Sequence, residues 1–328
     1  MTQTYAAAFD WARQQVETGA LPTAVLGIAD RSGVIALDAF GHTEGRPATV
    51  DDHYFLWSIT KVLVGLTAAR AIERGLVTPQ TPLTDALPEF GRDRDDAVLL
   101  RHLVSHTAGI PEPALDHRGA LREALLTPGR DFAAGWMSRY SSVAFDGVAA
   151  LLEHAAGSSW ESQLGAWTAA AGADGVTLDT SCDPHPVPDA AAAGVDMSAF
   201  AALRHPGAGA MARASDLLAI GSALLRGGDG IVAPATLGMM RRPLTGDIPR
   251  LEPYPADRGQ DWGFTWNLRT RAPGLIDTDV YGHGGWAGTE FWIHPRLGVA
   301  YVLLTNRAER SDVDADRLDN AIAAAASR

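Results

Sequence analysis

The sequence predicts an α+β fold in which helices flank an antiparallel sheet and an all-α region is inserted between the strands. Strand-like apolar runs lie at both ends of the chain, at 23–40 and at 262–305, and helical periodicity dominates between them. Strands from the two ends can pair into one sheet, which makes the helical middle an insertion. We therefore expect a discontinuous sheet domain of residues 1–57 and 205–328 and a mostly helical domain of residues 58–204.

The first elements are a helix and a hairpin. Residues 5–18 show the periodicity of an amphipathic helix, which Gly19 ends. Two apolar runs, Thr23–Ala29 and Val34–Phe40, predict a pair of strands. The turn-forming residues 30–33 between them predict a hairpin.

The middle of the chain carries mostly helical patterns. An apolar helix is expected around Ser58, running to about residue 74 and ending at Gly75. The sequence of residues 158–161 has the spacing of a capping box and predicts the start of another helix. Alanine, aspartate and proline are frequent in residues 171–198, which predicts a loop. Further helices are expected at 99–104, 113–127 and 143–156.

The last third of the chain changes from helices to strands. Helices are expected at 215–226, with Ser215 as N-cap, and at 234–241. A proline-rich surface loop at 243–261 follows, and we expect it near the functional site. A closing helix is expected at 311–325, with acidic residues in its first turns. The expected strands are Trp262–Leu268, Val280–His283, Glu290–His294 and Val299–Thr305.

The composition is that of an acidic globular protein. Of 328 residues, 46% are hydrophobic and 20% are charged, and the net charge of −12 argues against nucleic acid or anionic membranes as partners. The first ten residues lack the pattern of a secretory signal and no apolar run reaches the length of a membrane span, so we expect a cytoplasmic protein. The single cysteine, Cys182, excludes an internal disulfide. No histidine spacing fits a metal site, and we expect neither metal nor cofactor.

The first chemical motif is the pair Ser58 and Lys61. Residues three apart on a helix lie on one face, with Cβ atoms about 5–6 Å apart. A serine hydroxyl becomes a nucleophile when a neighbouring base takes its proton, and a buried lysine with a lowered pKa can be that base. Lys61 is the only lysine in the chain, and every other residue of the 27 Lys plus Arg is an arginine. Arginine stays charged and cannot act as a base, so the position of the one lysine favours catalysis over a chance pattern.

Two more motifs carry candidate groups. Tyr140 stands directly before the helix expected at 143, where a phenol can reach a nearby hydroxyl and act as acid or base. The glycine-rich sequence from His283 to Thr289 ends a predicted strand, and its glycines allow a substrate to lie against the strand edge. The backbone N–H groups of Trp286 and Ser58 could together form an oxyanion hole. For His106 we expect a hydrogen-bonded position in its loop.

The order and spacing of these motifs resemble those of the serine β-lactamase and penicillin-binding-protein superfamily. The resemblance is to the class C β-lactamase-like branch, which includes family VIII carboxylesterases and some acyltransferases of natural-product pathways. It covers about residues 20–310 and implies a β-lactamase-like fold with the active site between the two domains. The motifs that carry it are Ser58-Ile59-Thr60-Lys61, Tyr140-Ser141-Ser142 and His283-Gly284-Gly285, with Leu103–Gly109, Trp292–Pro295 and Leu303–Arg307 as further matches.

The resemblance implies a role for each residue of the motifs. Ser58 is expected to be the acylated nucleophile, with Lys61 and Tyr140 sharing the work of the base and Tyr140 protonating the leaving group. The N–H groups of Ser58 and Trp286 are expected to bind the oxyanion. The expected substrate-binding residues are Ser142, His283, Gly284, Gly285 and Trp57.

Two departures from the family pattern bear on the substrate. Lactamases of this branch usually have asparagine where this chain has Ser142, and lysine where it has His283. The asparagine binds an amide and the lysine supplies a cation for the β-lactam carboxylate, so losing both argues against efficient lactam hydrolysis.

The sequence therefore predicts a serine hydrolase that cleaves a small ester through an acyl-enzyme. A transacylase, which passes the acyl group to an alcohol or amine, is the first alternative and shares every catalytic residue. A β-lactamase-like or D-Ala-D-Ala peptidase-like activity and a non-catalytic ligand-binding relative are the others.

Overall fold

Eight antiparallel strands form the central sheet of the protein. The computed structural model describes residues 4–251, 259–271 and 274–328. The strand order is β3-β2-β1-β10-β9-β8-β7-β6, so strands from the two ends of the chain meet where β1 pairs with β10. The strands are β1 (Thr23–Asp30), β2 (Gly33–Thr43), β3 (Arg46–Pro47), β6 (Asp261–Trp262), β7 (Asn267–Leu268), β8 (Tyr281–Gly284), β9 (Glu290–His294) and β10 (Val299–Thr305). This is the antiparallel sheet that the sequence predicts.

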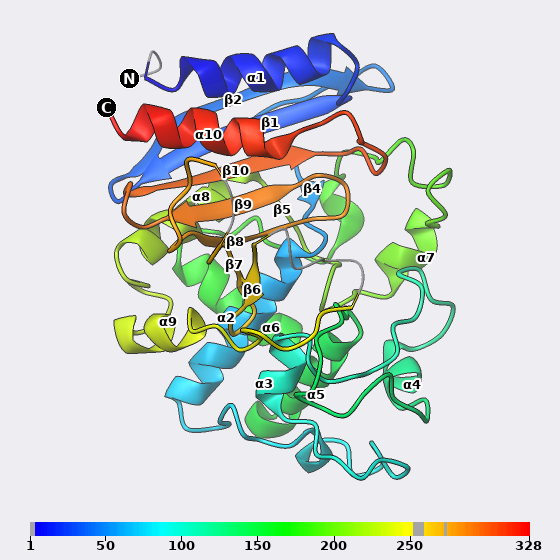
Figure 1. Cartoon of the computed structure of the whole chain (residues 1–328). Coiled ribbons are helices and arrows are strands. Elements are labelled where there is room, and N and C mark those ends of the chain that lie inside the picture. Colours follow the sequence, from blue (N-terminus) through cyan, green and yellow to red (C-terminus); the bar gives the residue numbers. More distant parts are fainter. Residues whose placement is uncertain (1–3, 252–258, 272–273) are drawn as a thin grey trace.

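Helices cover both faces of the sheet. On one face, α1 (Ala6–Glu17) and α10 (Ala315–Ala326) lie side by side, and the two chain ends meet there (Figure 1). On the other face, α8 (Ala214–Leu225) packs against β1 and β10. Gly27 of β1 makes this packing possible, because a Cβ at that position would lie 2.5 Å from a methyl carbon of Leu218.

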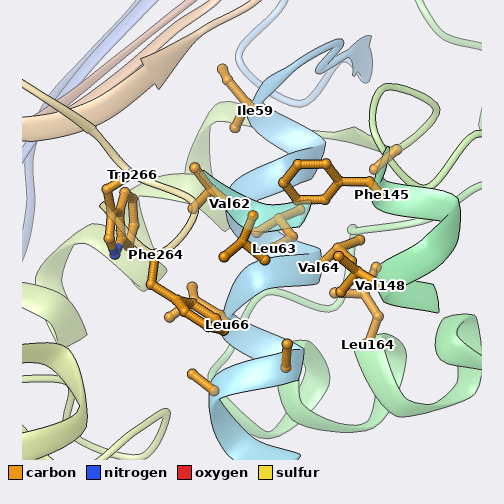
Figure 2. Packing of buried hydrophobic residues seen from close by; sticks show 14 of the residues in the cluster. Ile59, Val62, Leu63, Val64, Leu66, Phe145, Val148, Leu164, Phe264 and Trp266 are labelled. Atoms are coloured by element: carbon orange, nitrogen blue, oxygen red, sulfur yellow. The ribbon is translucent and has the colours of Figure 1, made fainter. Parts of the chain in front are cut away.

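The helix α2 (Ile59–Glu73) is the centre of the largest apolar cluster. Twelve of its fifteen residues are buried, among them Lys61. Its apolar side chains meet α5 and α6 on one side and the segment between β6 and β7 on the other (Figure 2). Fully burying one such aliphatic side chain contributes about 1.5–3 kcal/mol. A helix enclosed in this way is held firmly, and so are the side chains at its first turn.

The helical part of the chain surrounds α2 on the side away from the sheet (Figure 1). Strand β4 (Tyr54–Phe55) lies directly before α2 in the chain. It pairs with β5 (Met211–Ala212), and this pairing ties the start of α2 to a distant segment. The remaining helices are α3 (Leu100–Val104), α4 (Leu121–Leu125), α5 (Ala144–Ala156), α6 (Trp160–Ala170), α7 (Met197–Ala202) and α9 (Pro234–Met240), with 3₁₀ turns at Leu83–Asp85 and Thr180–Cys182.

The predicted strand Trp262–Leu268 is in fact a hairpin of two short strands. The N–H of Gly263 donates to the Trp266 carbonyl at 2.9 Å, and Thr265 has a positive φ of 71°. The hydroxyl of Thr265 donates to the carbonyl oxygen of Lys61 at 2.5 Å. This contact with α2 reverses the chain, and the sequence pattern of the segment does not reveal it.

Other differences lie at helix ends and in loops. Of the helix expected at 113–127 only α4 forms, because Gly119, at a φ of 152°, interrupts it. Ser215 is not the N-cap of α8: the helix begins earlier, and the Asp216 carboxylate accepts from the N–H of Arg213 at 2.9 Å. Asp314 caps α10, which starts later than expected. The predicted loop at 171–198 contains the start of α7, and part of the loop expected at 243–261 lies outside the described residues.

In the described part of the chain, every helix is too short or too polar to cross a membrane. The cytoplasmic location stays a sequence-based prediction.

Candidate active site

The candidate nucleophile, Ser58, stands at the N-cap of α2. Trp57 before it has a φ of 50°, a left-handed conformation that a bulky residue adopts only where the surrounding fold holds it. The ring of Trp57 is buried and stacks on Phe200 at 4.5 Å between centroids. This packing fixes the backbone turn that leaves Ser58 half-buried at the start of the helix.

Lys61 lies one helical turn further on and reaches back to Ser58. Its Nζ is 3.2 Å from the Ser58 Oγ, 3.0 Å from the Ser142 Oγ and 2.7 Å from the Gly207 carbonyl oxygen. The side chain is fully buried. Burial lowers the pKa of Lys61 to about 7, against the opposing attraction of the Glu112 carboxylate.

The partners of Lys61 determine what its neutral amine can do. A neutral amine has two N–H donors and one lone pair. The Gly207 carbonyl can only accept a hydrogen bond, and the Ser142 hydroxyl can accept the second. The lone pair is then left for the third partner, the hydroxyl proton of Ser58. This arrangement is the one that a general base needs.

Tyr140 lies between Lys61 and His283. The Lys61 Nζ is 4.6 Å from the centroid of the Tyr140 ring, and this ring stacks on His106 at 4.2 Å. The Tyr140 hydroxyl lies 3.5 Å from the Nε2 of His283. His106 accepts from the N–H of Ser141 at 3.1 Å, so the expectation of a hydrogen-bonded loop histidine is correct.

The protonation state of His283 follows from its neighbours. Its Nδ1 is 2.6 Å from the Gly284 carbonyl, which can only accept, so Nδ1 carries the proton. Burial and the charge of Lys61 lower the pKa of His283 to about 3, which keeps the ring neutral. Its Nε2 therefore has a free lone pair, and the Tyr140 hydroxyl is the donor in their contact. His283 is a hydrogen-bond acceptor here and supplies no cation.

A tight turn after β8 brings a second backbone segment to the start of α2. The hydroxyl of Thr289 donates to the Leu56 carbonyl at 3.1 Å, and the rings of Trp57 and Trp286 lie 4.7 Å apart. A Cβ at Gly285 would lie 2.7 Å from that same carbonyl oxygen, so this approach requires glycine. Within the described residues, the N–H groups of Ser58 and Trp286 both lack an acceptor.

These groups border a cavity of about 710 Å³. Its lining combines the three predicted motifs with residues of the sheet and of the segment after β10. The lining residues are Ser58, Glu112, Leu115, Arg139, Tyr140, Ser142, Gln260, Asn267, Arg269, His283, Gly284, Gly285, Trp286, Glu290, Trp292, Ala308 and Arg310.

A model of the beta-lactamase family matches residues 9–326 of the chain. The chain belongs to the beta-lactamase family. The likeness to solved structures of this beta-lactamase fold extends over the whole length. The hydrolase EstCE1, which has promiscuous acyltransferase activity, is 23% identical, with a TM-score of 0.80 over 99% of each chain. At 23% identity, this structural likeness is evidence for the fold alone.

Two curated relatives resemble this beta-lactamase-family protein over part of its length. Esterase EstB of Burkholderia gladioli is 32% identical over 103 residues, which are 30% of this chain and 24% of the esterase. Acyltransferase mokF of Monascus pilosus is 31% identical over 123 residues, which are 30% of this chain and 30% of the acyltransferase. The matched part thus spans less than a third of either relative.

The beta-lactamase fold brings most of the predicted site residues to the cavity, and two do not line it. Lys61 is fully buried and reaches the site only through its contacts with Ser58 and Ser142. Four of the five residues expected to bind substrate line the cavity: Ser142, His283, Gly284 and Gly285. Trp57, expected to bind substrate, is buried in an aromatic cluster and does not line the cavity. Its left-handed backbone turns the side chain inward, so it supports Ser58 from behind.

Sequence reasoning missed Glu112, which follows the loop of His106. The residue is exposed, but its carboxylate turns inward and accepts from the Ser141 hydroxyl at 2.7 Å and from the N–H groups of Ser142 and Val143 at 2.8 and 3.2 Å. These bonds hold the second motif in place. The one signal in the sequence is a carboxylate fixed between two prolines directly after the loop.

Proposed function

We propose that this protein is a serine hydrolase that cleaves a small ester through an acyl-enzyme on Ser58. The observation that carries the proposal is the environment of Lys61. The only lysine of the chain is fully buried, and two acceptors take its N–H groups while the third partner is the Ser58 hydroxyl. The esterase and acyltransferase matches support the same class of chemistry.

The proposed reaction proceeds in two halves. The Ser58 Oγ bonds to the ester carbonyl carbon, its proton passes to the Lys61 amine, and the carbonyl electron pair moves onto the oxygen. The bond to the leaving alcohol then breaks, and Tyr140 gives the alkoxide its proton. The first half leaves Tyr140 as a phenolate and Lys61 with the serine proton. In the second half water attacks the acyl carbon and gives its proton to the Tyr140 phenolate. The bond between the acyl carbon and the Ser58 Oγ then breaks, Lys61 returns its proton to that Oγ, and the acid leaves. The N–H groups of Ser58 and Trp286 bind the oxyanion in both halves.

We also propose that the acyl chain of the substrate carries no charge where it contacts the residues that line the cavity. Arg139 pairs with Asp131 at 2.5 Å, and Arg269 lies over the Trp292 ring at 4.3 Å, with Asp319 3.9 Å away. His283, where lactamases have a lysine, is neutral. A substrate carboxylate, such as that of a β-lactam, would therefore compete with protein partners for these two arginines. It would compete with the carbonyls of Trp286 and Gly285 for Arg310, which also lines the cavity. The geometry supports an ester with a neutral acyl chain over a β-lactam or a D-Ala-D-Ala peptide.

Transfer of the acyl group to an alcohol or amine is the alternative that the matches to mokF and EstCE1 favour. It uses the same acyl-enzyme and differs only in the second nucleophile. The division into a sheet domain of residues 1–57 and 205–328 and a helical domain of residues 58–204, with the site between them, remains part of the proposal.

Two measurements test the proposed function. Intact-mass analysis after a fluorophosphonate probe should show one adduct, located on Ser58. A panel of p-nitrophenyl esters, assayed with and without alcohol acceptors, should show turnover of the neutral butyrate well above that of the hemisuccinate. Absence of both the adduct and turnover would contradict the proposal and favour the alternative of a non-catalytic ligand-binding protein.

The pH dependence of kcat/KM should reflect the titration of the Lys61 amine. Because the base is the neutral amine, kcat/KM for a neutral ester should rise with pH and level off above a pKa of about 7. The histidines near Lys61, which are His106, His205 and His283, have pKa values lowered by burial and stay neutral. Glu112, whose own pKa is raised by burial, is the remaining titratable neighbour. Since Lys61 is the sole lysine, protein labelled with ¹⁵N-lysine gives one side-chain Nζ to titrate by NMR. A value near 10 would contradict the proposal.

Replacing Tyr140 by phenylalanine should slow alkyl esters more than p-nitrophenyl esters. An alkoxide needs a proton to leave, whereas p-nitrophenolate leaves without one. We expect kcat for the alkyl ester to fall by about 10²-fold, within the usual range for loss of a general acid. Tyr54→Phe is the matched control, because that buried phenol bonds to Thr23 at 3.0 Å and does not line the cavity. Equal losses for both esters would assign Tyr140 a packing role.

A further inference from the structure

Arg310, which follows β10, contacts the turn that carries Trp286. Its Nη1 donates to the Trp286 carbonyl at 2.6 Å and its Nη2 to the Gly285 carbonyl at 3.3 Å. The guanidinium also donates to the carbonyls of Ala308 and Arg307, at 3.1 and 3.4 Å. Arg310 is far from the three motifs in sequence, and the resemblance assigns it no role.

The contact of Arg310 with the Gly285 carbonyl fixes the direction of one peptide plane. The carbonyl of Gly285 and the N–H of Trp286 belong to the same peptide unit, and in a trans peptide they point in opposite directions. Arg310 bonds to the carbonyl side, and the N–H of Gly288 adds a second bond there at 3.0 Å. The N–H of Trp286 must therefore point away from Arg310. It does not donate to any described residue.

The turn is shaped to admit the guanidinium. Gly288 has a φ of 86°, and a Cβ there would lie 2.7 Å from the Nε of Arg310. On its other side the turn packs on Leu56 and Trp57, the two residues before Ser58. The peptide unit thus lies between a cation on the carbonyl side and the start of α2.

From this geometry we propose that Arg310 is a positioning residue for the oxyanion hole. It orients the Trp286 N–H, and by bonding to the carbonyl of the same peptide it makes that N–H a stronger donor, because hydrogen bonds in a chain polarise one another. The inference rests on the proposed function. It adds a cavity-lining residue whose charge acts on the transition state through a peptide bond.

The test compares Arg310→Met and Arg310→Lys with a neighbouring arginine. Arg307 is the matched control, because its guanidinium also bonds to carbonyls but to none of the turn that carries Trp286. Its partners are the carbonyls of Gly19, Ala20 and Glu309, at 2.5, 3.1 and 2.7 Å. For p-nitrophenyl butyrate we expect Arg310→Met to lower kcat by about 10–100-fold, somewhat less than removal of an oxyanion donor. KM should change less than threefold. Arg310→Lys should recover part of kcat, and Arg307→Met should leave kcat within twofold.

A boronic acid that forms a tetrahedral adduct on Ser58 separates this role from a structural one. Across the Arg310 variants, its inhibition constant should rise in proportion to the fall in kcat/KM, while that of a non-hydrolysable ether analogue stays constant. Unchanged kcat, a rise in KM alone, or an equal effect of Arg307→Met would overturn the inference and leave the proposed function standing. If the wild-type protein neither hydrolyses esters nor binds the probe at Ser58, the proposed function fails, and the inference fails with it.

Discussion

Ser58→Ala is expected to abolish both ester turnover and labelling by a fluorophosphonate. The Ser58 hydroxyl lies 3.2 Å from the buried amine of Lys61, and the Ser58 side chain reaches the cavity that Trp286 also lines. Loss of a catalytic serine typically lowers kcat by about 10⁴-fold or more, so the remaining rate should be close to background. Intact mass and initial rates with p-nitrophenyl butyrate measure the two effects.

The controls for Ser58→Ala exclude a folding defect. The side chain is small and half-buried, so the variant should keep the melting temperature of the wild-type protein within a few degrees. Ser158→Ala, at an exposed serine in the turn between α5 and α6, should label and turn over normally. An adduct that persists in Ser58→Ala would place the nucleophile elsewhere.

Lys61→Arg is expected to cause the second largest loss of activity, through a slower acylation of Ser58. Arginine keeps the positive charge and the donors, so it can bond to Ser142 and Gly207, but it cannot accept the proton of Ser58. Loss of the base should lower the acylation rate by about 10³–10⁴-fold. The rate of fluorophosphonate labelling, followed by mass over time, measures acylation without the second half of the reaction.

Lys61→Met distinguishes loss of the base from steric crowding by the larger guanidinium. Methionine is close to lysine in length and removes a buried amine, so the fold should persist while acylation is lost. Labelling at the wild-type rate in either variant would remove lysine from the mechanism. Arg70→Lys, on the last turn of the same helix, tests whether exchange of these residue types in α2 is tolerated away from the site.

Much of the fold could be predicted from the sequence because its elements have local signals. The strands β9 and β10 begin and end at the residues that their apolar runs predict. The hairpin of β1 and β2 follows from the turn residues between two apolar runs. The segment Trp262–Leu268 misled the prediction, since its reversal depends on a bond from Thr265 to α2, which is about 200 residues away in the chain.

The candidate site divides in the same way. The approach of Ser58 to Lys61 is a consequence of helical spacing and could be predicted. Glu112 could not, because its role depends on three bonds to a segment about 30 residues away. Arg310 could not either, since it reaches the turn at Trp286 only when β10 lies beside β9.

The sequence by itself determined the residue types and their spacing: one lysine, one turn after a serine, in an apolar helix, with a tyrosine and a glycine-rich strand end to follow. Only the tertiary structure decided the protonation of these groups and the direction of their hydrogen bonds. Burial sets the pKa of Lys61, a carbonyl sets the tautomer of His283, and Arg310 sets the peptide plane at Trp286. The physical reason is that spacing follows from local chain geometry, whereas solvation and charge depend on neighbours that the chain brings together only when it folds.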